Sequence, residues 1–138
     1  MIDTNLLLTR LEEIDKHLEK IAFFASLTYQ EFLSDSSAQD IVEYNLFQIV
    51  NHLITITQHI VVDEDYGLPQ TAYEAAQIVF DKGILDNDDL ELMKKMIGFR
   101  NVVGHNYLSI NKEVVYFILT EGRQDIKKIL AKITNRFL

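Results

Sequence analysis

The amino-acid sequence predicts an all-α fold, a bundle of about five helices, from three observations. The chain has 138 residues, 48% of them apolar and 25% charged, which is typical of one globular domain. It contains one proline and five glycines, so long helices are possible and a turn-rich sheet is disfavoured. Two long stripes of apolar residues recur at spacings of three and four, the period of a helix with one buried face. We therefore expect residues 1–138 to form a single domain.

The two stripes predict two long helices in the first half of the chain. The first stripe consists of Leu7, Leu11, Ile14, Leu18, Ile21 and Ala25. Residues 34–36, Ser-Asp-Ser, then break the pattern and offer side chains that can cap a helix N-terminus. The second stripe consists of Val42, Leu46, Ile49, Leu53, Ile56 and Ile60. Two such helices favour antiparallel packing in a bundle.

Local capping patterns predict three further helices. After a loop at residues 63–69, residues 71–74 fit a capping box, and the short helix that they begin should end at Gly83. The acidic residues 86–89 suit the positive end of a fourth helix. A break is expected at 104–110, after which Asn111 can cap a fifth helix. The inner face of that helix would carry Val115, Ile118, Leu119, Ile126, Ile129 and Ile133.

Several classes of function and location are disfavoured by composition. The chain has no cysteine, which excludes disulfides and thiolate metal sites and fits a reducing cytoplasm. We expect no secretory signal and no membrane span, because no apolar run is long enough. Glycine-rich phosphate loops and the common hydrolase and zinc-protease motifs are missing from the sequence, so we expect no cofactor.

The charge is unevenly distributed along the chain. Residues 1–93 carry 4 basic and 18 acidic side chains, whereas residues 94–138 carry 9 basic and 3 acidic ones. Such asymmetry suggests a surface that faces a polyanion such as RNA. The alternative is that the basic C-terminal third pairs with the acidic remainder of the chain.

The histidines outside the last third do not predict a metal site. His52 and His59 belong to a polar stripe on the second helix, which is either an exposed face or the lining of a groove or partner surface. The two lie about 10 Å apart along the helix axis, too far to share one ion. His17 sits among charged residues of the first helix, and we expect it to be solvated.

The segment Arg100-Asn-Val-Val-Gly-His105-Asn-Tyr107 combines a guanidinium, an imidazole and a phenol within eight residues. The fork of Arg100 matches phosphate oxygens, and His105 is suited to move protons near neutral pH. The pair could in principle cleave RNA without a metal. The histidine would take the proton of a ribose 2′-hydroxyl or supply one to the leaving oxygen, while the arginine would stabilise the charge on phosphorus. Spacing alone makes this a weak prediction, because such residues commonly cap helices.

The same segment resembles the Arg-x4-His-x-Tyr motif of the HEPN superfamily, and specifically of HepT-like proteins. Asn101 is the polar residue that HEPN nucleases favour after the arginine. Residues 92–99, which lead into the motif, and residues 58–60, 67–69 and 73–74 upstream are also similar. In this chain Gly104 precedes the histidine where relatives often have valine, which could loosen the segment that carries His105.

The resemblance implies a HEPN-type helical bundle that forms a homodimer, with the two motifs facing one cleft. It further implies the toxin of a type VII toxin–antitoxin pair, a metal-independent endoribonuclease in which Arg100 and His105 are catalytic and Asn101 supports them. The implied partner is an MntA-type nucleotidyltransferase antitoxin, which would silence the toxin by transferring AMP to Tyr107. The alternative is a catalytically weak HEPN subunit that serves as a scaffold and substrate for the nucleotidyltransferase.

Overall fold

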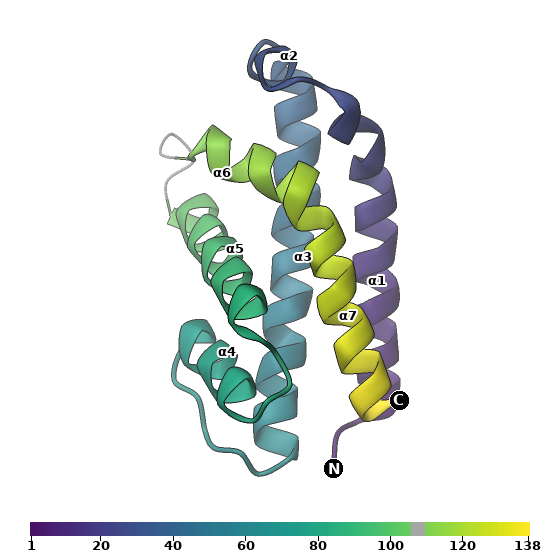
Figure 1. The fold of residues 1–138 in the computed structure, drawn as a ribbon, viewed down its shortest axis with the longest axis vertical. Coiled ribbons are helices and arrows are strands. Elements are labelled where there is room, and N and C mark those ends of the chain that lie inside the picture. The colour runs from purple at the N-terminus through teal and green to yellow at the C-terminus, as the bar shows by residue number, and fades with distance from the viewer. Residues whose placement is uncertain (106–109) are drawn as a thin grey trace.

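The all-α prediction is confirmed over the part of the chain that the structure describes. In the computed structural model these are residues 1–105 and 110–138, and every regular element within them is helical. The two long helices predicted from the apolar stripes are α1 (Thr4–Ala22) and α3 (Ser36–Asp63). They run antiparallel and contact each other along the bundle (Figure 1).

The connection between the two long helices contains structure that the apolar pattern does not predict. A short 3-10 turn, η1 (Phe23–Ser26), follows α1, and a one-turn helix, α2 (Tyr29–Leu33), precedes α3. Thr28 and Glu31 form a reciprocal capping box at the start of α2. Asp35 then caps α3 through its side chain, as the Ser-Asp-Ser break predicts.

The third predicted helix is confirmed as α4 (Ala72–Asp81). The Thr71 hydroxyl accepts a hydrogen bond from the backbone N–H of Glu74 at 3.0 Å. After the helix, Gly83 adopts a φ of 76°, which glycine alone tolerates without strain. The next residue, Ile84, is 6% exposed, so the chain turns back into the core at this C-cap.

The fourth predicted helix is α5 (Asn87–His105). Asp86 and Asp89 begin it by exchanging hydrogen bonds between the carboxylate of one and the backbone N–H of the other, at 2.8 and 2.9 Å. The break predicted at 104–110 starts later than expected, because α5 continues through Gly104 to His105. Gly104 is exposed, and a Cβ there would meet no atom of the described residues within 4 Å.

The fifth predicted helix is divided by a change of helical geometry. Asn111 caps α6 (Lys112–Phe117) as predicted, but a π-helical segment, η3 (Ile118–Gly122), separates it from α7 (Arg123–Phe137). The chain changes direction at this segment (Figure 1).

Gly122, at the end of the π-helical segment, lies close to Leu92 of α5. A Cβ on Gly122 would lie 3.4 Å from Cδ1 of Leu92 and 3.5 Å from Cβ of Ile118, at the short end of ordinary van der Waals contact.

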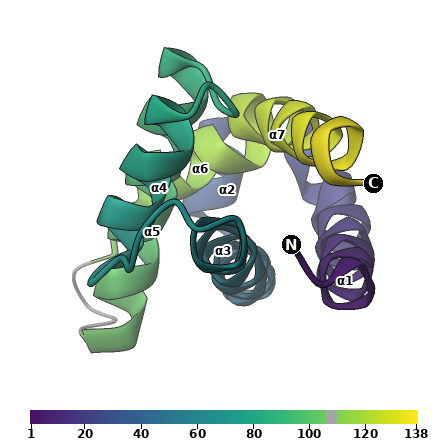
Figure 2. The ribbon, with the colours of Figure 1, turned by 90° about the horizontal axis from the view of Figure 1, so that it is seen from below.

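The core is centred on α3, which has α1 and α7 on one side and α4 and α5 on the other (Figures 1 and 2). Apart from Phe32 of α2, the largest fully buried side chains come from both apolar stripes and from α5, and they include Leu7, Ile14, Ile21, Leu46, Ile49, Leu53, Met93 and Met96. Among the described residues, no helix combines the length and the hydropathy that crossing a membrane would require.

Candidate active site

The last turns of α5 carry the first part of the motif. Phe99 and Val103, four residues apart, are 6% and 5% exposed and anchor this part of α5 to the core. Arg100 and Asn101 between them are partly exposed, and His105, the last helical residue, is exposed. The helix is thus fixed on one side and presents polar motif side chains on the other.

Helical geometry brings two of the motif residues onto one face and not the third. Asn101 and His105 are four residues apart and lie one turn above each other. Arg100 is five residues from His105, which rotates it by roughly 140° around the axis and about 7.5 Å along it. Within the described residues, no hydrogen bond or ion pair joins any two of the three. The Nε of Arg100 is buried and finds no acceptor there.

The motif tyrosine, Tyr107, lies outside the described residues, which omit 106–109. The prediction that its hydroxyl shares a surface with Arg100 and His105 therefore stays a prediction.

Two hollows lie beside the end of α5, whose residues 100–105 we call the motif turn. One, of about 250 Å³, lies between α3 and α5 and is lined by Asp40, Glu43, Tyr44, Phe47 and Val103. The other, of about 270 Å³, lies between α5 and the start of α6 and is mainly apolar, with two lysines at its edge. It is lined by Lys94, Lys95, Gly98, Phe99, Val102, Ile110, Asn111 and Val114. Val102 and Val103 of the motif segment thus line these hollows, whereas Arg100, Asn101 and His105 are not among the described residues that line them.

The basic C-terminal third is partly neutralised by the rest of the chain. Lys112 pairs with the buried Glu43 on α3, and Lys132 on α7 pairs with Asp86 and Asp89 at the start of α5. The alternative of internal pairing is therefore confirmed for Lys112 and Lys132, whereas a surface that faces a polyanion stays a prediction.

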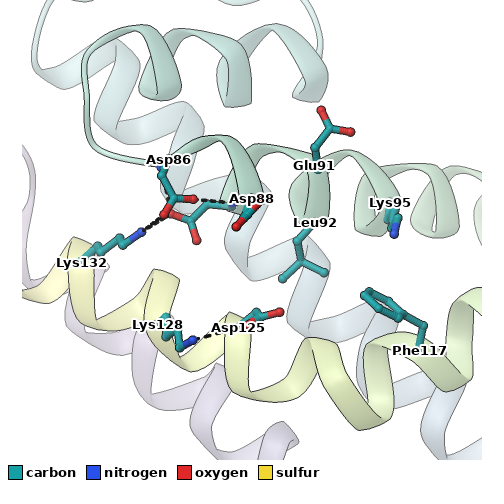
Figure 3. Close-up of a pocket in the computed structure, with 10 residues that line it drawn as sticks. Asp86, Asp88, Glu91, Leu92, Lys95, Phe117, Asp125, Lys128 and Lys132 are labelled. Atoms are coloured by element: carbon teal, nitrogen blue, oxygen red, sulfur yellow. Dashed lines mark hydrogen bonds and ion pairs between the residues drawn. The ribbon is translucent and has the colours of Figure 1, made fainter.

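The pairing of Lys132 borders a third hollow, of about 300 Å³, between the start of α5 and α7 (Figure 3). Five of the side chains that line it are acidic and three are lysines. Hydrogen bonds from the Asp89 backbone and the Lys132 ammonium lower the pKa of Asp86 to about 2. The carboxylates of Asp89 and Asp86 in turn raise the pKa of Lys132 through their hydrogen bonds with its ammonium group. An acidic hollow of this kind repels phosphate, so we do not regard it as an RNA site. The ion pairs of Lys132 with Asp86 and Asp89, which we call the clasp, connect α7 to the start of α5.

The expectation that His17 is solvated is wrong. It is 9% exposed, and its Nδ1 lies 2.8 Å from Oδ1 of Asn45 on α3. The His52 ring stacks near it, with 6.1 Å between the ring centroids. The polar stripe of α3 therefore faces α1 over part of its length, a contact between helices that the sequence pattern of either one alone does not reveal.

Comparison with known proteins identifies the family of this chain. A sequence model described as ribonuclease HepT-like matches residues 14–133, which span nearly the whole bundle. The chain belongs to the HepT-like ribonuclease family. The motif turn on α5 lies inside the matched range.

Two curated members of the family are distant relatives of this chain. The mRNA nuclease HepT of Shewanella oneidensis is 25% identical over 103 residues, covering 75% of this chain and 77% of the relative. The tRNA nuclease HepT of Aphanizomenon flos-aquae is 26% identical over 127 residues, covering 92% and 86%.

The fold also matches a solved structure, that of the tri-AMPylated Shewanella oneidensis HEPN toxin in complex with MNT antitoxin. The TM-score is 0.84 at 22% identity, over 98% of this chain and 99% of that one. The HEPN-type bundle predicted from the sequence is therefore confirmed.

Proposed function

We propose that this protein is the toxin of a type VII toxin–antitoxin pair and cleaves RNA without a metal ion. The observation that carries the proposal is the complete Arg100-x4-His105-x-Tyr107 motif at the end of α5, in a chain of the HepT-like ribonuclease family. The two curated relatives are named as nucleases of mRNA and of tRNA, which supports RNA as the substrate class.

In this mechanism His105 moves the proton and Arg100 stabilises the charge. The exposed imidazole at the helix end takes the proton of a ribose 2′-hydroxyl or supplies one to the leaving oxygen. Attack of the 2′-oxygen on phosphorus places extra negative charge on the non-bridging oxygens, which the guanidinium of Arg100 binds. Asn101, on the same face as His105, orients the imidazole or the substrate through its amide.

A homodimer would complete the site. One chain offers a single Arg100 and a single His105, which point about 140° apart around α5. A two-fold axis beside the motif would bring two arginines and two histidines to one cleft and concentrate positive charge where the RNA backbone binds.

The partner we propose is an MntA-type nucleotidyltransferase that transfers AMP from ATP to Tyr107. The tyrosine oxygen would bond to the α-phosphorus of ATP, pyrophosphate would leave, and the hydroxyl proton would be released. The solved structure of an AMPylated HEPN toxin with an MNT antitoxin supports this partner class.

The test is cleavage of total RNA by the purified protein in the presence of EDTA. Arg100→Ala should lower the rate by about a hundredfold or more, as loss of one charge-stabilising donor does. His105→Ala should lower it by about a hundredfold to ten-thousandfold, as loss of a general acid or base does. Both variants should keep the wild-type circular dichroism, because Arg100 and His105 lie outside the main core. If EDTA abolishes cleavage while the circular dichroism remains that of the folded protein, the metal-free mechanism is wrong.

The same assay separates the toxin from the alternative of a catalytically weak scaffold subunit. A scaffold would accept AMP from the nucleotidyltransferase but leave RNA intact, and the two alanine variants would then be indistinguishable from the wild type. Genomic proximity to a nucleotidyltransferase would not distinguish the two functions, since both require that partner.

A further inference from the structure

A cluster of potential metal ligands lies between α1 and α3, away from the motif. Glu13, His17 and His52 each place a ligand atom within 4.8 Å of the other two. Glu13 and His17 are one helical turn apart on α1, and His52 lies on the facing side of α3. α1 and α5 flank α3 on opposite sides, so the cluster and the motif occupy different surfaces (Figure 1).

The hydrogen bonds around His17 leave one ring nitrogen available as a ligand. Asn45 donates its Nδ2 to the carbonyl oxygen of Ile41 at 2.7 Å, which turns its Oδ1 toward His17. An amide oxygen only accepts, so Nδ1 of His17 carries the proton and Nε2 keeps its lone pair. A histidine held through one nitrogen, with the other free, is the usual arrangement behind a metal ion. Asn45 is 4% exposed, so this support is rigid.

The position of His52 fits a shared ion. Its ring centroid is 6.1 Å from that of His17. Two imidazoles on one tetrahedral zinc ion, with each nitrogen ~2.0–2.1 Å from the metal, place their centroids roughly 5 Å apart. Small side-chain rotations therefore suffice.

The third ligand and an access route are present as well. The Lys16 ammonium donates a hydrogen bond to Oε1 of the Glu13 carboxylate at 3.1 Å, and the second oxygen of that carboxylate can bind a metal ion. Glu13 and His52 line a hollow of about 410 Å³ that opens to solvent beside α1. An ion can reach the cluster without unfolding the helices.

One side chain competes for this site. Arg10 lies with its Nη1 3.1 Å from Nδ1 of His52, and since a guanidinium only donates, it occupies that nitrogen's lone pair. A metal ion on Nδ1 of His52 would need the lone pair that Arg10 occupies. A metal ion on Nε2 would need a proton on Nδ1, which the Arg10 contact also prevents. A metal must displace it.

We infer that Glu13, His17 and His52 form a zinc site that links α1 to α3, with Arg10 as its competitor. Two imidazoles and a carboxylate are a ligand set that zinc accepts, with solvent as the fourth ligand. The ion would hold together the two longest helices of the first half of the chain and stabilise the folded state by binding to it alone. This site is separate from the cleavage reaction and independent of the proposed function.

The experiment measures metal binding to the untagged protein. Zinc uptake after dialysis gives the stoichiometry, and cobalt serves as a spectroscopic probe because four-coordinate cobalt absorbs visible light strongly. We expect about one equivalent of zinc and a rise in the unfolding temperature that EDTA reverses. His17→Ala and Glu13→Gln should each weaken binding by at least about tenfold, equivalent to about 1.4 kcal/mol. Glu13→Gln is exposed enough to fold normally and should cleave RNA like the wild type.

Two further variants make the test specific. Arg10→Ala removes the competitor and should tighten zinc binding severalfold, a gain that general damage to the fold would not produce. His59→Ala, on the same helix but paired with Asp63 at 3.6 Å, should bind zinc like the wild type. Uptake well below one equivalent, equal affinity in His17→Ala and the wild type, or weaker binding in Arg10→Ala would each overturn the site.

Discussion

Glu43 on α3 and Lys112 at the start of α6 form an ion pair with two hydrogen bonds, of 2.9 and 2.8 Å. Glu43 is 6% exposed and lines the hollow beside Val103 of the motif turn. Lys112 lies five residues beyond Tyr107 in the sequence. The pair therefore fixes the chain just after the motif to the central helix.

Removing the lysine of this pair should destabilise the protein. Lys112→Ala leaves the Glu43 carboxylate buried without its partner. We expect the free energy of unfolding to fall by about 1–3 kcal/mol. This loss is smaller than that for a fully buried pair, because Lys112 is partly exposed. The measurement is urea denaturation. The control is Lys94→Ala, which breaks an exposed pair with Glu91 and should change stability by less than about 0.5 kcal/mol. Equal losses in the two variants would contradict this role for Lys112.

The helices themselves were largely predictable because their causes are local. The two apolar stripes and the caps at Asp35, Thr71 and Asn111 act over three or four residues, which the sequence displays directly. The π-helical segment at residues 118–122 was not predictable, because the spacing of the apolar residues from Val115 to Ile133 continues across it as in one uninterrupted helix.

The candidate site was predictable only where a motif carries it. Arg100, Asn101 and His105 are recognisable as a string, and the structure locates them at the end of α5. The cluster around His17 has no such string, because His52 lies 35 residues beyond His17 and the two meet only when α1 packs on α3. A histidine beside charged residues looks solvated until the partner helix is in place.

The clasp between α5 and α7 should weaken in acid. The pKa of Asp86 falls from 3.8 to about 2 in the folded protein, so the folded state favours the ionised carboxylate. Its contribution to stability is therefore present above about pH 4 and lost as the pH falls toward 2. Lys132 stays protonated over this range, since its pKa is raised.

The corresponding measurement is the unfolding temperature of Lys132→Met and wild type between pH 7 and pH 2. The variant should be less stable at neutral pH, and the difference should shrink as the pH drops from 4 to 2. Lys128→Met, which breaks a longer and exposed pair with Asp125 at 3.8 Å, is the matched control. A difference between Lys132→Met and wild type that is constant with pH would show that Asp86 does not titrate through this contact.

The proposed dimer should depend on the surface beside the motif. Tyr44 is 60% exposed although it is aromatic, and it lines the same hollow as Val103. A two-fold interface that joins two motifs must cover surface near it, so Tyr44→Glu should shift the protein toward monomer and reduce RNA cleavage in parallel. Sedimentation at micromolar concentration gives the oligomeric state. Leu8 is also exposed and belongs to α1, which lies across α3 from α5 (Figure 1), so Leu8→Glu should remain dimeric. A monomeric wild-type protein would refute the dimer itself.

The last prediction concerns the control of the toxin through Tyr107. Transfer of AMP to its oxygen would add a phosphodiester with about one negative charge, by analogy with phosphorylation, close in sequence to His105. Arg100 could pair with that phosphate, and the adenosine would fill the proposed RNA-binding cleft, so RNA would be excluded while the fold is unchanged.

Tyr107→Phe keeps the ring but removes the oxygen that accepts AMP. We expect this variant to cleave RNA like the wild type, to take no label from ATP in the presence of the nucleotidyltransferase, and to remain toxic beside it. The measurements are intact mass and growth during co-expression, with Tyr116→Phe as a control that should still be modified. If Tyr107→Phe gains the mass of AMP, another residue is the acceptor and this mechanism of control is wrong.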